Sequence, residues 1–210
     1  EFNIPIVGIT GSNGKTMVKE WLYQLLQPSQ RIVRSPRSYN SQIGVPLSVW
    51  LLSEQTEVGI FEAGISQPGE MMALHDIIQP TIGVLTCLSN AHQEYFRSME
   101  EKCLEKLELM HDTQAMVYPS DDNIVSRCIR RMHYQGERIG WSRTDEQAPF
   151  FVKETTQAAQ TTRISYIYKG VQGEYTIPFI DEASIDDSII CAVIALHIGL
   201  TPEELAERIL

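Results

Sequence analysis

A glycine-rich segment near the amino terminus carries the residue types of a phosphate-binding loop. It runs from Gly8 to Thr16 (GITGSNGKT), between an apolar run, Ile4 to Ile9, and an amphipathic run, Met17 to Leu26. In a strand, glycine turn and helix, backbone N–H groups and the helix dipole can hold an anion, a Lys adds charge and a Thr hydroxyl can bind Mg²⁺. The alternative is a glycine turn beside a surface lysine. The predicted nucleotide-binding residues are Thr10, Gly11, Ser12, Asn13, Gly14, Lys15 and Thr16.

Two residues that follow predicted strands could add metal ligands near this loop. Glu62 lies at the end of the apolar run 58–63, and His92 follows the run 81–86. In a parallel sheet the carboxyl ends of the strands line the ligand crevice. We expect Glu62 to complete the coordination of a Mg²⁺ ion held by Thr16, with a solvated strand-end carboxylate as the alternative. His92 is a candidate metal or catalytic residue, although a loop histidine is usually structural or exposed.

Lys106 lies at the border of an apolar arc on a predicted helix over 98–110. Partial burial disfavours the ammonium and lowers its pKa. A neutral amine could react with CO₂, and the resulting carbamate would be a carboxylate-like metal ligand. The alternative is a lysine whose stem packs on apolar surface while its head reaches water.

Four polar loop residues are candidates for nucleotide and substrate contacts. Asp121 and Asp122 follow a predicted strand and could receive ribose hydroxyls or adenine, or could cap the next helix. Asn40 and Ser41 belong to the donor-rich loop 37–42, which could hold an anionic substrate or be an ordinary polar loop.

The positions of these residues depend on an alternation of apolar and amphipathic runs. Strands are predicted at 4–10, 31–34, 58–63, 81–86 and 115–118, and helices at 15–26, 43–52, 69–78, 98–110 and 123–132. This order predicts an α/β fold with a doubly wound, mainly parallel sheet and helices on both faces.

The pattern changes near residue 136. Short alternating runs at 150–155, 163–169 and 174–179 predict antiparallel hairpins at the edge of the sheet. A helix is predicted over 184–198, and another begins with Thr201 as N-cap and Pro202 at its first position.

Composition restricts the class of protein. The chain has 210 residues and a formal net charge of −10, which argues against a broad nucleic-acid-binding surface. Four widely spaced cysteines contain no CxxC motif, so free thiols in a reducing compartment are expected. We predict a cytoplasmic protein without membrane insertion, because no apolar run reaches spanning length and no signal peptide precedes Ile4.

Five motifs, in the same order, resemble those of the Mur ligases, the ATP-dependent amide-forming enzymes of peptidoglycan precursor synthesis. Thr10–Thr16 resembles the TGTNGKT loop of that family. The other four match the branch that adds D-alanyl-D-alanine to UDP-N-acetylmuramoyl-tripeptide. They are Tyr39–Leu47 (NNxIGVPL), Glu62–Gly64 with Gly69–Glu70 (ExG…GE), Ala91–Phe96 with Ser98 (AHxExFxS) and Glu105–Glu108 (AKGE).

The resemblance implies a set of roles. Lys15 and the loop amides would hold the phosphates of ATP, and Thr16 and Glu62 would bind one Mg²⁺. His92 and a carbamylated Lys106 would hold a second Mg²⁺. Asn40 and Ser41 would contact the UDP-linked substrate. The implied catalytic residues are Lys15, Glu62, His92 and Lys106.

The second half of the chain departs from the family pattern. Pro119–Asp122 replaces an Asn-rich motif, and Ala183–Ser188 stands where His-Asn-x-x-Asn is usual, so the adenine contacts differ. This divergence resembles the form fused to alanine racemase. Residues 1–210 resemble the central ATP-binding domain, whose partners in the parent chain would be an N-terminal UDP-binding domain and a C-terminal domain.

Two alternatives remain open. The chain could belong to another Mur ligase or to folylpolyglutamate synthase. It could also be a non-catalytic nucleotide-binding switch, although such a switch needs neither His92 nor Lys106.

Overall fold

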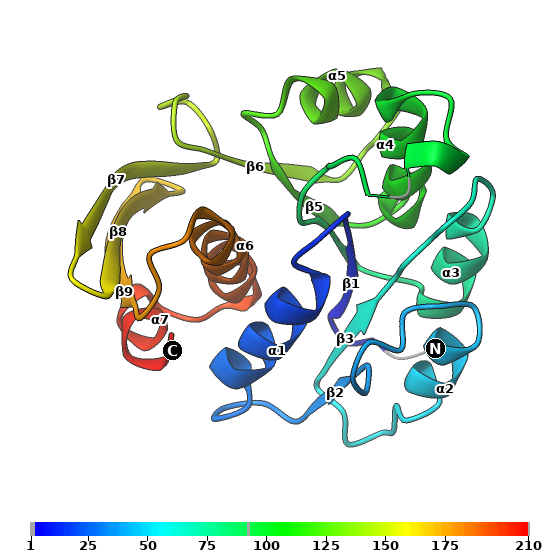
Figure 1. Ribbon diagram of the computed structural model, residues 1–210. Helices are drawn as coiled ribbons and strands as arrows, with labels where there is room; N and C mark the ends of the chain where they lie inside the picture. Colours follow the sequence, from blue (N-terminus) through cyan, green and yellow to red (C-terminus); the bar gives the residue numbers. More distant parts are fainter. Residues whose placement is uncertain (1–2, 92, 210) are drawn as a thin grey trace.

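The computed structural model describes residues 3–91 and 93–209, which form a single nine-stranded sheet with helices on both faces (Figure 1). The strands are β1 (Ile6–Thr10), β2 (Ile32–Arg34), β3 (Val58–Glu62), β4 (Ile82–Leu85), β5 (Ala115–Pro119), β6 (Glu137–Ser142), β7 (Phe150–Ala158), β8 (Thr161–Tyr168) and β9 (Val171–Ile177). The helices are α1 (Lys15–Leu26), α2 (Gly44–Val49), α3 (Met71–Ile78), α4 (Met99–Leu107), α5 (Asn123–Arg131), α6 (Glu182–Ile198) and α7 (Pro202–Arg208), with 3₁₀ turns η1 (Gln93–Tyr95) and η2 (Glu108–Met110).

The sheet order is β2-β3-β1-β4-β5-β6-β7-β8-β9. Neighbours from β2 to β7 pair in parallel, and β8 pairs antiparallel with both β7 and β9. The predicted α/β class, the doubly wound parallel sheet and the antiparallel hairpins at its edge are therefore confirmed.

Alternating side chains of each central strand supply two cores. Val7 and Ile9 of β1 pack into the core beneath α1 and α6, whereas Ile6 packs into the core beneath α2 and α3. A third cluster lies beneath α4 and α5. Because both faces are covered, the central parallel strands β1, β3 and β4 are buried along their whole length and are mostly apolar.

Strand β6 is the element that the sequence prediction lacked. It pairs in parallel with β5 and with the start of β7, so it joins the parallel sheet to the hairpins. Its first residues, Glu137 and Arg138, are exposed, and only Ile139 to Ser142 are buried. Because β6 begins with charged residues and has only a short buried part, its sequence has little of the hydrophobic pattern that predicts a strand.

The ends of the parallel strands give the sheet a carboxyl edge and an amino edge, each named after the strand ends that lie there. The carboxyl ends of β1, β3, β4, β5 and β6 lie at one edge, where the glycine loop follows β1. The amino ends of β4 and β5, with Thr81 and Gln114 directly before them, lie at the other edge. Within the part of the chain that the structure describes, every helix is too short or too polar to span a bilayer.

Candidate functional site

The loop between β1 and α1 has the backbone that its glycines predict. Gly11 and Gly14 have φ angles of 145° and 82°, and Gly14 is the N-cap of α1. A Cβ on Gly11 would overlap the Thr86 hydroxyl, and one on Gly14 would overlap the Asp187 carboxylate. Both positions therefore require glycine for space as well as for conformation.

The end of β4 holds this loop in place. The Ser12 amide donates to the carbonyl of Cys87 at 2.9 Å, and the Ser12 hydroxyl accepts from the Ser89 amide at 3.0 Å. The Thr86 hydroxyl donates to the carbonyl of Asn13. Thr10 is buried, and its hydroxyl has no hydrogen-bond partner among the described residues.

Two lysine side chains converge on one carbonyl of the loop. Lys15 Nζ donates to Gly11 O at 2.9 Å, and Lys106 Nζ donates to the same oxygen at 3.2 Å. Burial lowers the pKa of Lys15, and the Glu62 carboxylate opposes that shift. Burial and the charges of Lys15 and Lys102 lower the pKa of Lys106 to about 8. The crowding of cations favours an anion at this point.

The predicted burial of Lys106 is confirmed, since the residue is 3% exposed. Its amine turns inward to Gly11 instead of reaching water along the helix surface. Lys106 lies on α4, whose N-cap is Ser98, at the start of the predicted helix; the Ser98 hydroxyl accepts from the Glu101 amide at 3.1 Å. The Glu101 carboxylate accepts from the Arg97 amide, one residue before the position that a complete capping box requires.

Glu62 is a fully buried carboxylate at the end of β3. The Thr16 hydroxyl donates to Glu62 Oε2 at 3.1 Å, and Asn40 Nδ2 lies 3.4 Å from the same oxygen. Adjacent ligands of an octahedral Mg²⁺ with bonds of 2.0–2.1 Å lie about 3 Å apart. The separation of Thr16 Oγ1 and Glu62 Oε2 therefore fits two neighbouring positions around one Mg²⁺ ion.

Lys19 is a site residue that the sequence analysis missed. It is fully buried on α1, forms ion pairs of 3.0 Å with Glu62 and Glu20, and donates to the carbonyl of Arg37. Its position four residues after Lys15 places both lysines on one helix face. That spacing was the available signal.

A cavity of about 260 Å³ opens between the loop and α4. Lys102 is the second residue that the sequence analysis missed; it is buried, and its amine donates to the carbonyls of Ser89, at 2.6 Å, and Ala91. The cavity is lined by Gly11, Ser12, Lys15, Asn40, Ser41, Gly64, Ile65, Ser66, Ala91, Lys102 and Lys106.

The predicted residues thus fall into four groups, of which the pair Asp121 and Asp122 lies apart from the loop. Lys15, Asn40, Ser41 and Lys106 share the cavity, and Thr16 and Glu62 are joined beside it. His92, a predicted catalytic and metal-binding residue, lies outside the described residues.

Asp121 and Asp122 line a second cavity, of about 280 Å³, next to Cys87 and Asp186. Asp122 is the N-cap of α5 and accepts from the amides of Ile124 and Val125, so the capping alternative describes its contacts here. Asp121 accepts from the amide of Arg143 at 2.8 Å and from the hydroxyls of Ser142 and Thr144.

Comparison with known proteins identifies relatives of this chain. A family model described as the Mur ligase middle domain matches residues 9–195. The chain is 28% identical over 210 residues to UDP-N-acetylmuramoyl-tripeptide–D-alanyl-D-alanine ligase of Borreliella burgdorferi and 24% identical over 210 residues to that of Bacillus subtilis. These matches cover 97% and 99% of this chain but only 44% of each relative. The chain therefore spans less than half the length of the curated relatives.

Solved structures share the fold. MurF from Acinetobacter baumannii superposes with a TM-score of 0.88 at 20% identity, covering 98% of this chain and 45% of that chain. MurF ligase from Thermotoga maritima in complex with ADP superposes with a TM-score of 0.83 at 23% identity, covering 98% and 48%. The family match, which extends over most of the sequence, shows that this chain belongs to the Mur ligases and corresponds to their middle domain.

Proposed function

We propose that residues 1–210 are the central ATP-binding domain of a ligase that adds D-alanyl-D-alanine to UDP-N-acetylmuramoyl-tripeptide in the cytoplasm. The observation that carries the proposal is the meeting of Lys15 and Lys106, from two different helices, on the Gly11 carbonyl beside the Thr16–Glu62 pair. The names of the Borreliella and Bacillus relatives support this acceptor. The remaining domains of a parent chain would bind the UDP moiety and close over ATP.

The residues around the loop suit phosphoryl transfer, which is mainly a matter of positioning and charge neutralisation. Lys15 and the loop amides would hold the β- and γ-phosphates. Lys15 would then give up its hydrogen bond to the Gly11 carbonyl. Thr16 and Glu62 would hold Mg²⁺, as their 3.1 Å separation supports. A bound Mg²⁺ would neutralise charge on the phosphate oxygens. Asn40 and Ser41 would contact the UDP-linked substrate, and Asp121 and Asp122 would lie nearer the nucleoside.

Lys106 would act as a carbamate. Its neutral amine would attack CO₂, forming an N–C bond and releasing a proton to solvent. A pKa of about 8 leaves a useful fraction of the amine neutral near pH 7. The carbamate would neutralise part of the positive charge that Lys15 and Lys102 create. By family resemblance, this carbamate and His92 would hold a second Mg²⁺.

The complete reaction has two steps. A carboxylate oxygen of the peptide attacks the γ-phosphorus of ATP, forming an acyl phosphate and releasing ADP. The amine of D-alanyl-D-alanine then attacks the acyl carbon, releases phosphate and loses a proton, which leaves an amide. For the isolated 210-residue protein we expect weak or no turnover.

The direct test measures inorganic phosphate released by the parent enzyme and its Lys15→Ala and Lys106→Ala variants, with both substrates present. We expect a large loss in both variants and parental activity in Lys153→Ala, which changes an exposed lysine on β7. Near-parental rates in Lys15→Ala and Lys106→Ala would remove the mechanism.

A second measurement separates the alternatives. The structure is also similar to a folylpolyglutamate synthase variant from L. casei, with a TM-score of 0.69 at 12% identity. Amino acids, D-alanyl-D-alanine and glutamate should therefore be compared as acceptors. Phosphate release that needs D-alanyl-D-alanine supports the proposal, release with glutamate supports the synthase, and release that no acceptor stimulates supports a nucleotide switch.

A further inference from the structure

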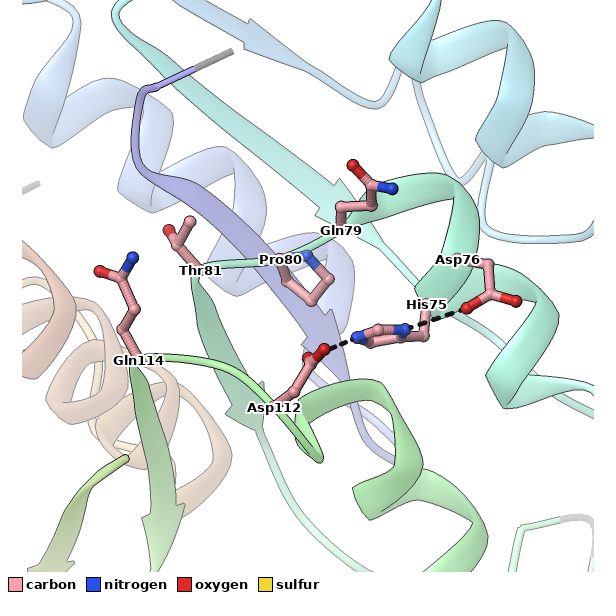
Figure 2. A pocket seen from close by; sticks show the side chains of 7 residues that line it. All are labelled: His75, Asp76, Gln79, Pro80, Thr81, Asp112 and Gln114. Atoms are coloured by element: carbon pink, nitrogen blue, oxygen red, sulfur yellow. Dashed lines mark hydrogen bonds and ion pairs between the residues drawn. The ribbon is translucent and has the colours of Figure 1, made fainter. Parts of the chain in front are cut away.

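A cluster of two histidines and an aspartate lies at the edge of the sheet opposite the glycine loop. His75 is in the last turn of α3, and His111 and Asp112 lie in the connection from η2 to β5. Figure 2 shows the His75 imidazole pointing at the Asp112 carboxylate beside a cavity of about 430 Å³. Thr81 and Gln114, which precede β4 and β5, also line that cavity.

The three side chains present their ligand atoms to one point. His75 Nε2 lies 2.8 Å from Asp112 Oδ1, and His111 Nε2 lies 3.7 Å from Asp112 Oδ2. One ligand atom from each residue falls within 4.8 Å of the others. Ligands of a tetrahedral Zn²⁺ with bonds of 2.0–2.1 Å lie about 3.3 Å apart. Small side-chain rotations would therefore bring all three onto one ion.

In each histidine Nδ1 contacts an oxygen outside the cluster, which leaves Nε2 as the nitrogen that would bind a metal ion. His111 Nδ1 lies 3.1 Å from the Glu108 carbonyl, and His75 Nδ1 lies 3.4 Å from the Asp76 carboxylate. His75 Nε2 donates to Asp112 Oδ1, so a metal ion would displace that proton, and the Nδ1 contacts of both rings would then hold each Nε2 toward the ion. Metal-binding histidines usually have this second contact, which fixes the ring and its tautomer.

The electrostatics also favour a cation. A metal ion would replace the proton between His75 Nε2 and Asp112 and would bind that nitrogen, His111 Nε2 and the Asp112 carboxylate together. Asp76 adds a second carboxylate on the far side of His75. His75 is buried, whereas His111 and Asp112 are exposed, so an ion can enter from solvent without unfolding the core.

We propose that His75, His111 and Asp112 form a binding site for a divalent transition-metal ion, best suited to Zn²⁺ with water as its fourth ligand. Two imidazoles and one carboxylate match Zn²⁺, whereas Mg²⁺ prefers oxygen ligands. The ion would join α3 to the segment that leads into β5, far from the nucleotide. Its role would be structural, because ligand binding to the folded state stabilises it.

The test uses the 210-residue protein without a histidine tag, stripped with a chelator. Zn²⁺ is titrated in competition with a chromogenic chelator, and Co²⁺ is added separately to record its visible spectrum. We expect one tight Zn²⁺ site per chain, a tetrahedral Co²⁺ absorption band, and a raised unfolding temperature with Zn²⁺ that millimolar Mg²⁺ does not reproduce.

The variants His111→Ala and Asp112→Asn change exposed positions and should fold normally. Each should weaken Zn²⁺ binding at least about tenfold and abolish the Co²⁺ band, whereas the matched control His133→Ala, an exposed histidine after α5, should leave both unchanged. Lys15→Ala should also bind Zn²⁺ normally, so that failure of the nucleotide proposal is distinguishable. Absence of a tight site, or parental Zn²⁺ affinity in His111→Ala and Asp112→Asn, overturns the proposal.

Discussion

The buried carboxylate of Glu62 has two neighbours with different roles. Thr16 faces the side where a Mg²⁺ ion would bind, and Lys19 holds the other side with a 3.0 Å ion pair in which both side chains are fully buried. A buried pair of this kind adds little net stability, but removing one partner leaves a charge without compensation. We infer that Lys19 keeps the Glu62 carboxylate oriented for the metal.

Lys19→Met should therefore destabilise the fold. We expect the free energy of unfolding to fall by about 3–5 kcal/mol, the usual effect of breaking a buried pair. Urea denaturation measures this loss, and Lys153→Met provides an exposed control. The double variant Lys19→Met/Glu62→Gln should recover much of the stability, because no buried charge then lacks its partner. A loss below about 1 kcal/mol in Lys19→Met would contradict the role given to the pair.

Asp187 gives the stability a pH dependence. Burial, together with the charges of Asp186 and Asp181, raises the pKa of its carboxyl from an ordinary value of 3.8 to about 7. The folded state therefore binds this proton more tightly than the unfolded state. The protonated carboxyl of Asp187 therefore makes its full contribution to the free energy of unfolding below about pH 4, and this contribution is lost as the pH rises to about 7.

Asp187→Asn should remove the loss of stability that the parent shows as the pH rises, because an amide does not ionise. We expect the variant to match the parent in free energy of unfolding near pH 4 and to exceed it by roughly 2–4 kcal/mol at pH 8. Denaturation curves at several pH values measure the difference, with the exposed Asp145→Asn as a control for general charge effects. A constant difference between parent and variant across this range would count against the raised pKa.

At the scale of elements, local signals predicted what local chemistry determines. Thr201 caps α7 in a complete capping box with Glu204, and Pro202 opens that helix, as the sequence indicated. Strand β6 was missed because its exposed, charged beginning does not look like a strand in the sequence. Its pairing with β5 and β7 stabilises it, and the hydrophobic pattern of a sequence does not reveal which strands pair. The ion pair of Lys19 with Glu62 was missed for the same reason: it joins α1 to β3.

The turn from β1 into α1 allows a matched comparison between two glycines. Gly14 and Gly170 have similar φ angles, 82° and 79°, but a Cβ has open space at Gly170 and would overlap Asp187 at Gly14. Alanine at either position should cost about 1–2 kcal/mol for the left-handed backbone. Gly14→Ala should cost more, because Asp187 must also move; equal losses in thermal denaturation would refute the close contact.

At the scale of the whole molecule, one sheet separates two sites. The proposed nucleotide site lies at the carboxyl edge, and the histidine cluster lies at the amino edge, on α3 and on the connection from η2 to β5. Sequence motifs predicted the first site because its residues come in recognised runs. They gave no sign of the second, because His75 and His111 are separated in the chain and meet only through the packing of α3 beside η2.

An exposed apolar surface lies on one side of α2 and at its ends, a few residues after Asn40 and Ser41 in the chain. Its side chains are Ile43, Leu47, Trp50 and Leu51, and Trp50 is 88% exposed. Apolar patches of this kind often mark protein contacts. The proposed function places this chain within a longer ligase, so we expect another domain of that ligase to cover this surface.

Hydrogen exchange tests that contact. The backbone amides of residues 44–51 should exchange more slowly in a parent-length chain than in the 210-residue protein, while those of the hairpin 161–168 should be unchanged. Equal exchange of residues 44–51 in both proteins would contradict a contact at α2.

Lys15, Thr16 and Glu62 are proposed to bind a nucleoside triphosphate together with Mg²⁺. Calorimetric titration of the 210-residue protein with a non-hydrolysable ATP analogue, with and without Mg²⁺, tests it most directly. We expect Mg²⁺-dependent binding that Lys15→Ala weakens at least about tenfold and Lys153→Ala leaves intact, with both variants folded. Unchanged affinity in a folded Lys15→Ala protein would contradict it.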